Sequence, residues 1–242
     1  MWRYIHARTV ARVLPRMRPP VADHGAALNR FLRTTVESRR TFAVLQIGAY
    51  DGVANDSVAD LLRDYAYVRA VLLEPQPQAF AALQELWRDV PRITPIEAAL
   101  ATGCGERPLY VIADHRKHLH PFAEQVASFS RAHVENECNR YVWRPSEDFV
   151  ISVPVRTVDW RTLMVQHGPF DLVAIDAEGY DGEILHQMDL SRQSPGLILY
   201  EHRHLDKHLR SQCVRLLERA GYLVRQVNKG DTIASRIGLP GF

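Results

Sequence analysis

Acidic side chains and histidines gather in two short segments of the second half of the chain, IDAEGYD at residues 175–181 and YEHRHL at residues 200–205. Each segment continues an apolar, strand-like run, so Asp176 and Glu201 stand where a strand gives way to a loop. Carboxylates and imidazoles placed together can orient a polar substrate, take up its proton or bind a cation. These two segments are therefore the first candidates for catalytic groups.

A glycine turn follows an earlier apolar run, in VLQIGAYDG at residues 44–52. Glycine lets a ligand approach the backbone closely, and the start of the following helix favours anionic groups. The spacing is G-x-x-x-G, because Tyr50 and Val53 stand where the G-x-G-x-x-G of dinucleotide sites has its second and third glycines. Asp51 favours a ligand that carries an amine. A purely structural turn is the alternative.

The next apolar run ends in Glu74, 22 residues after Gly52. An acid about 20 residues past such a turn is where α/β sheets bind the hydroxyls of a ribose. A carboxylate accepts hydrogen bonds from both hydroxyls of a vicinal diol. A solvated glutamate at a strand end is the alternative, but together the two features favour a nucleoside without a pyrophosphate.

The scaffold for these residues is an alternation of apolar strands and amphipathic helices from residue 41 onward. Strands are predicted at 41–48, 68–74, 93–100, 171–176, 197–201, 222–228 and 231–237, and helices at 57–65, 77–87, 158–166, 181–188 and 206–221. This order predicts an α/β domain over 41–242, with a mainly parallel sheet covered by helices on both faces. An insert at 101–157 holds polar loops and two further strands, at 108–113 and 149–155, and we expect it to act as a substrate lid.

The first 40 residues are expected to form a separate, basic helical extension. They carry nine Arg and two acidic residues, a net charge of +7, whereas the rest of the chain carries −5. Residues 1–20 place apolar side chains near one helical face, and a second helix is predicted at 28–39. The extension is compatible with packing on the domain, a homodimer contact, a membrane-surface or nucleic-acid arm, or a targeting presequence.

The composition indicates in which cellular compartment the protein works and which classes of protein are not expected. No run approaches the ~18 apolar residues of a membrane span, so stable membrane insertion is not expected. The three cysteines are far apart and form no CxxC, which favours free thiols in a reducing compartment over a disulfide framework or a zinc site. We therefore expect a cytoplasmic protein.

The motifs together resemble the FkbM family of S-adenosylmethionine (AdoMet)-dependent methyltransferases. The resemblance covers about residues 42–236; IDAEGYD and YEHRHL are its most specific parts, and it further includes VLQIGAYDG, VLLEPQPQAFAAL, VRTVDW and GYLVRQVNKGDTIAS. It implies the class I methyltransferase fold, a doubly wound seven-stranded sheet with the last strand antiparallel, and usually O-methylation. Many members carry Asp where Gln46 stands, which puts one expected contact to the methionine end of the cofactor in doubt.

Carried over by position, the resemblance implies a set of cofactor contacts. The methionine moiety is expected against the glycine turn, the ribose at the end of the second strand, and the adenine at the end of the third. Ser128, in ASFSR at 127–131, is expected near the cofactor or substrate. The implied cofactor-binding residues are Gln46, Gly48, Ala49, Tyr50, Asp51, Glu74, Pro75, Gln76, Glu97, Ala98, Ser128 and Asp176.

In that fold the strands ending at Asp176 and Glu201 are neighbours, about 4.8 Å apart, so their carboxylates are expected to share one crevice. Asp176 is expected to orient the acceptor or the amine of AdoMet. His202 is the leading candidate for the general base, because an imidazole titrates near working pH, and Glu178 and Glu201 would position the substrate or His202. A surface loop carrying His202 and His204 is the alternative, and no metal site is expected among Asp176, Glu201 and His202.

Other features of the insert carry weaker predictions. His115, His118 and His120 are interrupted by Arg116 and Lys117, which would repel a cation, so a polar loop is favoured over a metal cluster. Aromatic walls for a sugar or ring substrate are expected from Tyr141, Trp143 and Phe149.

These observations predict an O-methyltransferase acting on a hydroxyl, or a carboxylate, of a sugar, glycan or natural product. A non-catalytic AdoMet- or partner-binding module is the alternative. A nicotinamide oxidoreductase is disfavoured by the missing G-x-G-x-x-G. Nucleic-acid methylation is disfavoured because the basic arm is small and IDAEG is unlike the NPPY-type segments that hold a flipped base.

Overall fold

The computed structural model describes residues 24–53, 57–113, 123–142 and 149–238. Most of the predicted basic extension, the histidines at 115, 118 and 120, Trp143 and the side chain of Tyr141 lie outside this part of the chain. Within the described residues, no helix is both long enough and apolar enough to cross a membrane.

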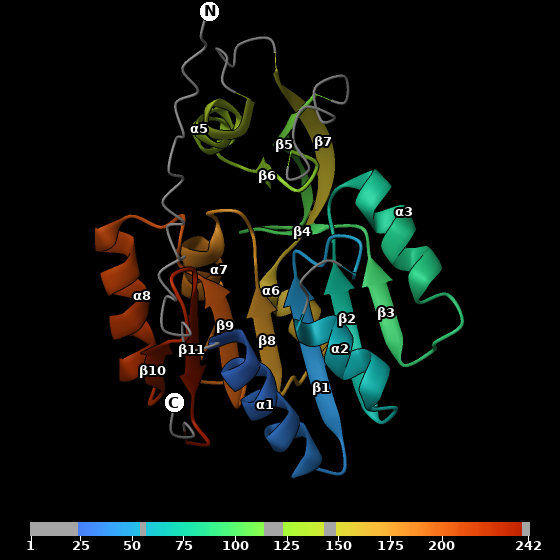
Figure 1. The fold of residues 1–242 in the computed structure, drawn as a ribbon, viewed down its shortest axis with the longest axis vertical. Coiled ribbons are helices and arrows are strands. Elements are labelled where there is room, and N and C mark those ends of the chain that lie inside the picture. The colour runs from blue at the N-terminus through green and yellow to red at the C-terminus, as the bar shows by residue number, and fades with distance from the viewer. Residues whose placement is uncertain (1–23, 54–56, 114–122, 143–148, 239–242) are drawn as a thin grey trace, which may run out of the picture.

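A seven-stranded sheet forms the centre of the molecule, in the order β10-β11-β9-β8-β1-β2-β3 (Figure 1). Its strands are β1 (Phe42–Ile47), β2 (Val68–Leu73), β3 (Ile93–Ile96), β8 (Leu172–Ile175), β9 (Leu197–Glu201), β10 (Leu223–Gln226) and β11 (Asp231–Ser235). Strand β11 runs antiparallel to both of its neighbours, and the pairs from β9 to β3 are parallel. The predicted doubly wound sheet with an antiparallel last strand is therefore confirmed.

Helices cover both faces of this sheet, as the alternation of strands and helices predicts. One face packs against α1 (His24–Glu37), α2 (Ser57–Asp64) and α3 (Pro77–Leu86), and the other against α6 (Trp160–His167), α7 (Asp181–Gln187) and α8 (Lys207–Arg219). All six residues of β1 are buried, because a central strand has a helical layer on each side. Aspartates at Asp159 and Asp206 cap α6 and α8 by accepting hydrogen bonds from backbone N–H groups of the first turn.

The insert forms a second, smaller sheet above the carboxyl ends of the main strands (Figure 1). Its strands, in the order β4-β7-β5-β6, are β4 (Ala99–Leu100), β7 (Val150–Val158), β5 (Gly105–Ile112) and β6 (Ala127–Ser128). Helix α5 (Arg131–Val142) packs on it. The sequence did not predict this helix, because its residues are mostly polar and show no clear apolar face. In the structure, Val134 and Cys138 are its buried apolar side chains among those described.

The single strand predicted at 93–100 is wrong. The chain turns after Ile96, where the N–H of Ala98 donates to the carbonyl of Ile96, a three-residue turn. The residues before the turn continue the main sheet as β3, and those after it begin the small sheet as β4. The apolar run therefore serves two sheets, which a periodicity argument cannot separate.

The ends of β1 and β8 approach one another so closely that only glycine fits at residue 48. Gly48 has φ of +82°, and a Cβ built on it would lie 1.8 Å from the carbonyl oxygen of Asp176. The same segment is bound on its other side, since the N–H groups of Gly48 and Ala49 both donate to the carbonyl of Leu73 in β2. Gly48 therefore sets the spacing of the three strand ends that carry the predicted site.

Replacing Gly48 with alanine is expected to lower the free energy of unfolding by about 2–4 kcal/mol, because the side chain adds both left-handed strain and a backbone collision. Thermal unfolding followed by circular dichroism should show a melting temperature lower by roughly 4–16 °C for a domain of this size. Gly103→Ala is the matched control, since no atom lies within 4 Å of its Cβ position. A Gly48→Ala protein that melts with the wild type would contradict the close approach.

Candidate active site

A cavity of about 380 Å³ opens at the carboxyl ends of the parallel strands, beneath the small sheet. Its floor comes from the ends of β1, β2, β8 and β9, and its roof from residues of β5 and β6 and the segments beside them. Twelve of the predicted site residues line it: Gln46, Gly48, Ala49, Tyr50, Glu74, Pro75, Gln76, Ala98, Ser128, Asp176, Glu178 and Glu201. The topology thus gathers into one cavity predicted site residues that are up to 155 positions apart in the chain, from Gln46 to Glu201.

Three predicted residues lie elsewhere. Asp51 belongs to the glycine turn, where its Oδ1 accepts a hydrogen bond from the N–H of Val53 at 2.9 Å. Glu97 lines a separate surface depression between α3 and β7. His202 is buried beside β11 and does not line the cavity. The contacts predicted for these three side chains stay predictions.

Glu74 is buried at the carboxyl end of β2, and two hydrogen bonds fix the orientation of its side chain. Its Oε2 accepts a hydrogen bond from the N–H of Tyr50 and its Oε1 from the N–H of Gln76, both at 2.8 Å. Burial nevertheless raises the pKa of this carboxyl to about 7. A carboxylate offers about four acceptor positions, so the two backbone bonds leave room for hydroxyl donors of a ligand.

Two non-glycine residues in the described chain have a left-handed backbone, and both line the cavity. Tyr50 and Glu178 each have φ of +46°, a conformation that costs energy for residues with a Cβ. Such strain concentrates at functional sites, where the surrounding structure enforces it. At Tyr50 the strained turn directs an N–H toward Glu74, and at Glu178 it directs a carboxylate toward two histidines.

The ends of β8 and β9 bring a group of carboxyls together, as predicted. Glu201 is 9% exposed, and burial together with Asp176 and Glu178 raises its pKa to about 8. Asp181, which was not predicted as a site residue, is fully buried beneath them and accepts hydrogen bonds from the N–H groups of Ala177 and Glu201 at 3.3 and 3.2 Å. Burial, with Asp176 and Glu201, raises the pKa of Asp181 well above its ordinary value. Its place in the first turn of α7, after IDAEGY, is the only signal the sequence offers.

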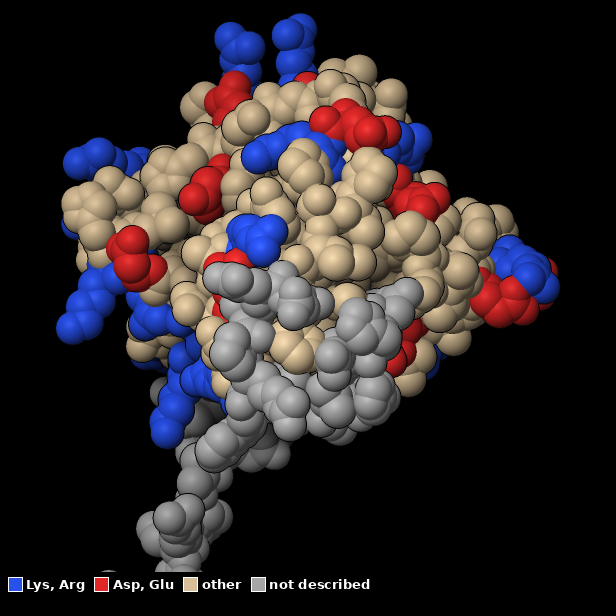
Figure 2. Space-filling view, turned by 90° about the horizontal axis from the view of Figure 1, so that it is seen from above, with Lys and Arg blue, Asp and Glu red and all other residues tan. Residues whose placement is uncertain are grey.

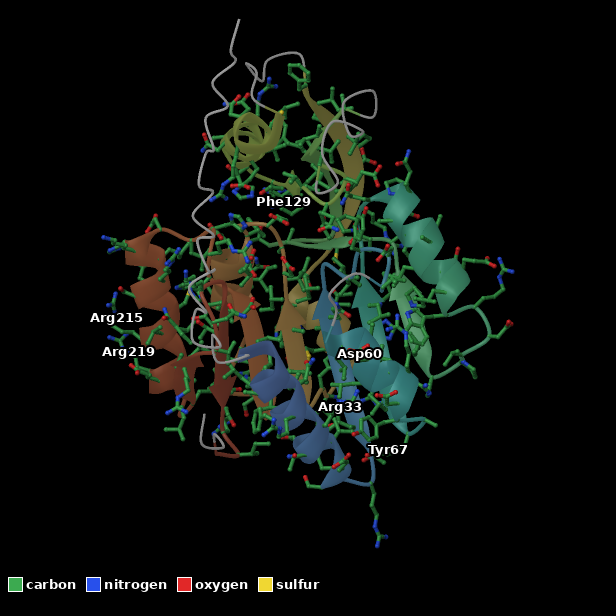
Figure 3. All side chains as sticks on the ribbon, in the orientation of Figure 1. Arg33, Asp60, Tyr67, Phe129, Arg215 and Arg219 are labelled. Carbon is green, nitrogen blue, oxygen red and sulfur yellow. The ribbon has the colours of Figure 1, made fainter. Side chains whose placement is uncertain are left out.

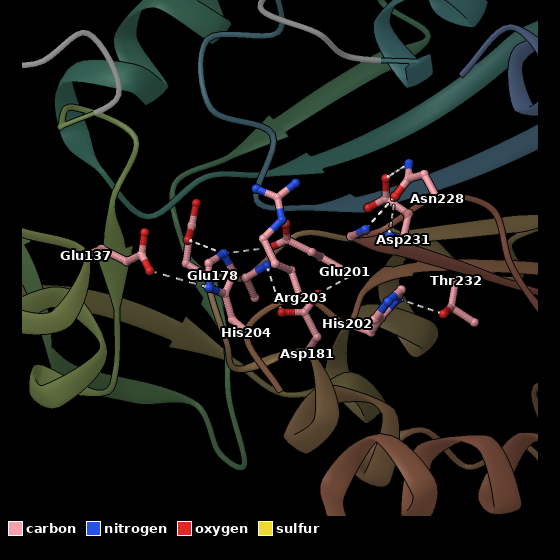
Figure 4. Close-up of polar contacts among 12 residues, drawn as sticks. Glu137, Glu178, Asp181, Glu201, His202, Arg203, His204, Asn228, Asp231 and Thr232 are labelled. Atoms are coloured by element: carbon pink, nitrogen blue, oxygen red, sulfur yellow. Dashed lines mark hydrogen bonds and ion pairs between the residues drawn. The ribbon is translucent and has the colours of Figure 1, made fainter. Parts of the chain in front are cut away.

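His202 and His204 point in different directions, although they are two residues apart (Figure 4). His202 is 3% exposed, and its Nδ1 lies 2.9 Å from the hydroxyl of Thr232 in β11. Burial lowers the pKa of His202. His204 turns toward Glu178 and Glu201 instead. The alternative of a solvated surface loop is therefore wrong for both imidazoles.

The insert is tied to the main sheet through Ser128 and a cluster of rings. The hydroxyl of Ser128 donates to the carbonyl of Glu178 at 2.8 Å. Phe129, which lies between the small sheet and the main sheet (Figure 3), packs edge-to-face on Tyr180, with ring centroids 5.1 Å apart. The guanidinium of Arg107 lies 4.4 Å from the centroid of Phe129, a cation–π contact. The aromatic wall therefore comes from Phe129 and Tyr180, whereas Phe149 is buried in the core between α5 and the small sheet.

The arrangement has two chemically different ends. One end combines backbone close to the ligand space with the buried carboxylate of Glu74, which suits a nucleoside-bearing cofactor. The other end presents Asp176, Glu178 and Glu201 beneath the aromatic wall, which suits a cationic centre and a polar acceptor.

Comparison with known proteins agrees with this geometry. Residues 46–224, more than half of the chain, match the family described as the methyltransferase FkbM domain. No curated protein sequence matches the chain significantly.

Three solved structures with a similar fold are distant in sequence. The methyltransferase FkbM from Methylobacillus flagellatus KT has 13% identity and a TM-score of 0.50, over 81% of this chain and 43% of that one. A precorrin-6y C5,15-methyltransferase from Geobacter metallireducens GS-15 has 16% identity and a TM-score of 0.44, over 87% and 86% of the two chains. An O-methyltransferase from Bacillus cereus, solved with SAH, has 13% identity and a TM-score of 0.41, over 86% and 80%.

The chain thus spans less than half the length of the FkbM structure it resembles. The family match includes the glycine turn, Glu74 and both acidic segments of the cavity. The chain belongs to the FkbM family of methyltransferases.

Proposed function

We propose that this chain transfers the methyl group of AdoMet to a hydroxyl oxygen of a small acceptor, such as a sugar, a glycan end or a natural product. The observation that carries the proposal is the buried carboxylate of Glu74, which accepts hydrogen bonds from two backbone N–H groups. Glu74 lines the same cavity as the glycine turn. A ribose diol supplies hydroxyl donors for acceptor positions of this carboxylate that the backbone bonds leave open. AdoMet combines such a ribose with an amine and no pyrophosphate.

The charge at the other end of the cavity supports a cationic cofactor. AdoMet carries a positive sulfonium and a positive amine, and both are stabilised by nearby carboxylates. Asp176 stands beside Gly48, so we assign it to the amine or to the acceptor hydroxyl. The ribose end and the acidic end are joined by Gln46, Gly48 and Ala49, which line the space between them.

The same carboxylates favour a hydroxyl over a carboxylate as the methyl acceptor. Asp176, Glu178 and Glu201 all line the cavity, and a negatively charged acceptor among them would be repelled. A neutral hydroxyl can donate a hydrogen bond to one of them.

Seen from above, this end of the molecule carries acidic and basic side chains scattered around its rim, with no broad basic patch on the described part of that face (Figure 2). A nucleic acid strand would favour continuous positive charge, so the view supports a small acceptor.

Transfer requires the acceptor oxygen to lie in line with the S–CH₃ bond. The new C–O bond forms as the C–S bond breaks, the sulfur keeps the electron pair, and the hydroxyl proton passes to a base. His202 is the predicted base, but it is buried outside the cavity lining. Glu178 and Glu201 lie at the cavity wall and are better placed to receive the proton directly.

Binding of AdoMet is expected to weaken below neutral pH. The raised pKa of Glu74 leaves the carboxyl half protonated at about pH 7, and only the ionised form accepts both ribose hydroxyls. The competent fraction falls about tenfold from pH 8 to pH 6, so the dissociation constant should rise by about tenfold. Calorimetric titration of AdoMet and S-adenosylhomocysteine at both values measures this change.

Glu74→Gln is the test variant for that pH dependence. It should bind at least tenfold more weakly at pH 8, roughly 1.4 kcal/mol, and its affinity should no longer depend on pH in this way. Glu106→Gln, an exposed carboxyl on β5, is the matched control and should keep the wild-type profile. Equal loss in both variants, or no binding of either ligand to the wild type, would refute the ribose assignment.

Turnover is expected only when a hydroxyl acceptor is present. A panel of sugars and hydroxylated small molecules, with matching carboxylic acids, can be screened for release of S-adenosylhomocysteine and for incorporated methyl label. Asp176→Asn should lower kcat/KM by about 10²-fold, because it removes a charge that orients cofactor or acceptor. Asp89→Asn, an exposed residue between α3 and β3, should have no effect. Tight AdoMet binding with no turnover on any acceptor would favour the non-catalytic binding module.

A further inference from the structure

We propose that His133, Glu178 and His204 bind a divalent transition-metal ion of the zinc type beside the acceptor end of the cavity. One potential ligand atom from each of the three side chains lies within 4.8 Å of those of the other two. They come from α5, from the loop after β8 and from the loop after β9. Binding of the ion does not depend on the proposed methyl transfer. The role of the ion in activating the acceptor rests on the proposed function.

The spacing of the ligand atoms fits a small coordination sphere. Oε2 of Glu178 lies 3.4 Å from Nε2 of His133 and 3.6 Å from Nε2 of His204, so one carboxylate oxygen faces both imidazoles. The two rings stand nearly perpendicular, with centroids 4.7 Å apart. Ligands held about 2.1 Å from a tetrahedral metal are roughly 3.4 Å from each other. Small side-chain adjustments would therefore close the group around an ion.

The backbone around Glu178 holds this carboxylate in place. Glu178 has a left-handed φ, and its carbonyl accepts a hydrogen bond from the hydroxyl of Ser128. This bond anchors the loop to the small sheet. Gly179 follows, and a Cβ there would lie 3.5 Å from both Nδ1 of His133 and Cβ of His204. The two histidines thus pack closely over a loop whose strain aims Glu178 between them.

The outer groups match what a bound metal requires of its surroundings. Metal-bound histidines usually present the other ring nitrogen to a carboxylate, which orients the ring. Oε1 of Glu137 lies 4.0 Å from Nδ1 of His204, whereas Glu178 faces the other ring nitrogen, Nε2 (Figure 4). Glu137 is four residues after His133 on α5, so one helix supplies a ligand and this orienting carboxylate. Oε2 of Glu201 lies 3.3 Å from Nε2 of His204, at the cavity side of the three ligands.

The local charge also favours a dication. Glu137, Glu178 and Glu201 bring three carboxylates around the two imidazoles, and Arg140 and Arg203 pair with two of them. With neutral histidines and all three carboxyls ionised, the group carries a net negative charge. Two imidazoles and a carboxylate suit zinc and its neighbours, whereas Mg²⁺ and Ca²⁺ prefer oxygen ligands alone.

Three protein ligands leave a coordination position open, as in catalytic zinc sites. Of the three ligands, Glu178 lines the cavity, and we place the open position on that side. A hydroxyl bound there would lose its proton more readily, because the metal acts as a Lewis acid. The proton would pass to water or a neighbouring carboxylate, and the resulting alkoxide would attack the methyl carbon as the C–S bond breaks.

The test is titration of Zn²⁺, Mn²⁺ and Mg²⁺ into the full chain, with metal content measured after dialysis and the visible spectrum recorded with Co²⁺. One Zn²⁺ per chain is expected, with Mg²⁺ much weaker. His133→Ala, Glu178→Gln and His204→Ala should each weaken Zn²⁺ binding by at least 10²-fold and remove the tetrahedral Co²⁺ spectrum. Glu137→Gln should cost about 10-fold, as loss of an orienting partner does.

Controls separate this site from other histidines and from misfolding. His208→Ala, an exposed histidine on α8, and His118→Ala in the insert should bind Zn²⁺ as the wild type does. Melting curves and AdoMet titration report the fold of every variant, and His133→Asn provides a second, milder change on α5. Absence of Zn²⁺ binding by a wild type that binds AdoMet would overturn the metal site and leave the proposed function intact. Zn²⁺ binding abolished by His118→Ala but kept by His133→Ala and His133→Asn would overturn it as well.

Discussion

The site depends on the contact between two backbones, Gly48 at the end of β1 and Asp176 at the end of β8. No side chain fits between them, since a Cβ on Gly48 would overlap the carbonyl oxygen of Asp176. The contact brings the glycine turn against the acidic loop, and the hydrogen bonds of Gly48 and Ala49 to Leu73 join β2 to the same point. Glu74, which follows β2, is thereby held in a fixed position beside the glycine turn.

Buried carboxyls are the second constraint, and they explain why the cavity suits positive ligands. Glu74 and Asp181 are both nearly or fully inaccessible and both have raised pKa values, because burial penalises their ionised forms. Their backbone N–H donors reduce that cost without removing it. In the cavity, hydroxyl donors of a ligand would stabilise the ionised form of Glu74, and a cationic group would stabilise that of Glu201, whose pKa is also raised.

The small sheet and α5 complete the acceptor end. Ser128 fixes the loop after β8, Phe129 packs on Tyr180, and α5 delivers His133 and Glu137 to the histidine of the loop after β9. The insert is therefore part of the cavity wall in this structure, and under the proposed function it would contact the acceptor. Under that proposal the sheet would hold the cofactor and the insert would supply the contacts to the acceptor.

Sequence by itself determined the order of strands and helices, the glycine turn and the acidic strand ends. These features are local: the alternation of apolar and polar residues sets the elements, Gly48 marks a turn, and Glu74, Asp176 and Glu201 end apolar runs. The family's motifs then identified the sheet order that makes β8 and β9 neighbours. Tertiary structure alone decided the split at Ile96, helix α5, the burial of His202 and Asp181, and the meeting of His133, Glu178 and His204. Each of these depends on contacts between segments distant in the chain, and the direction in which a side chain points after a strand is set by those contacts and not by its neighbours in sequence.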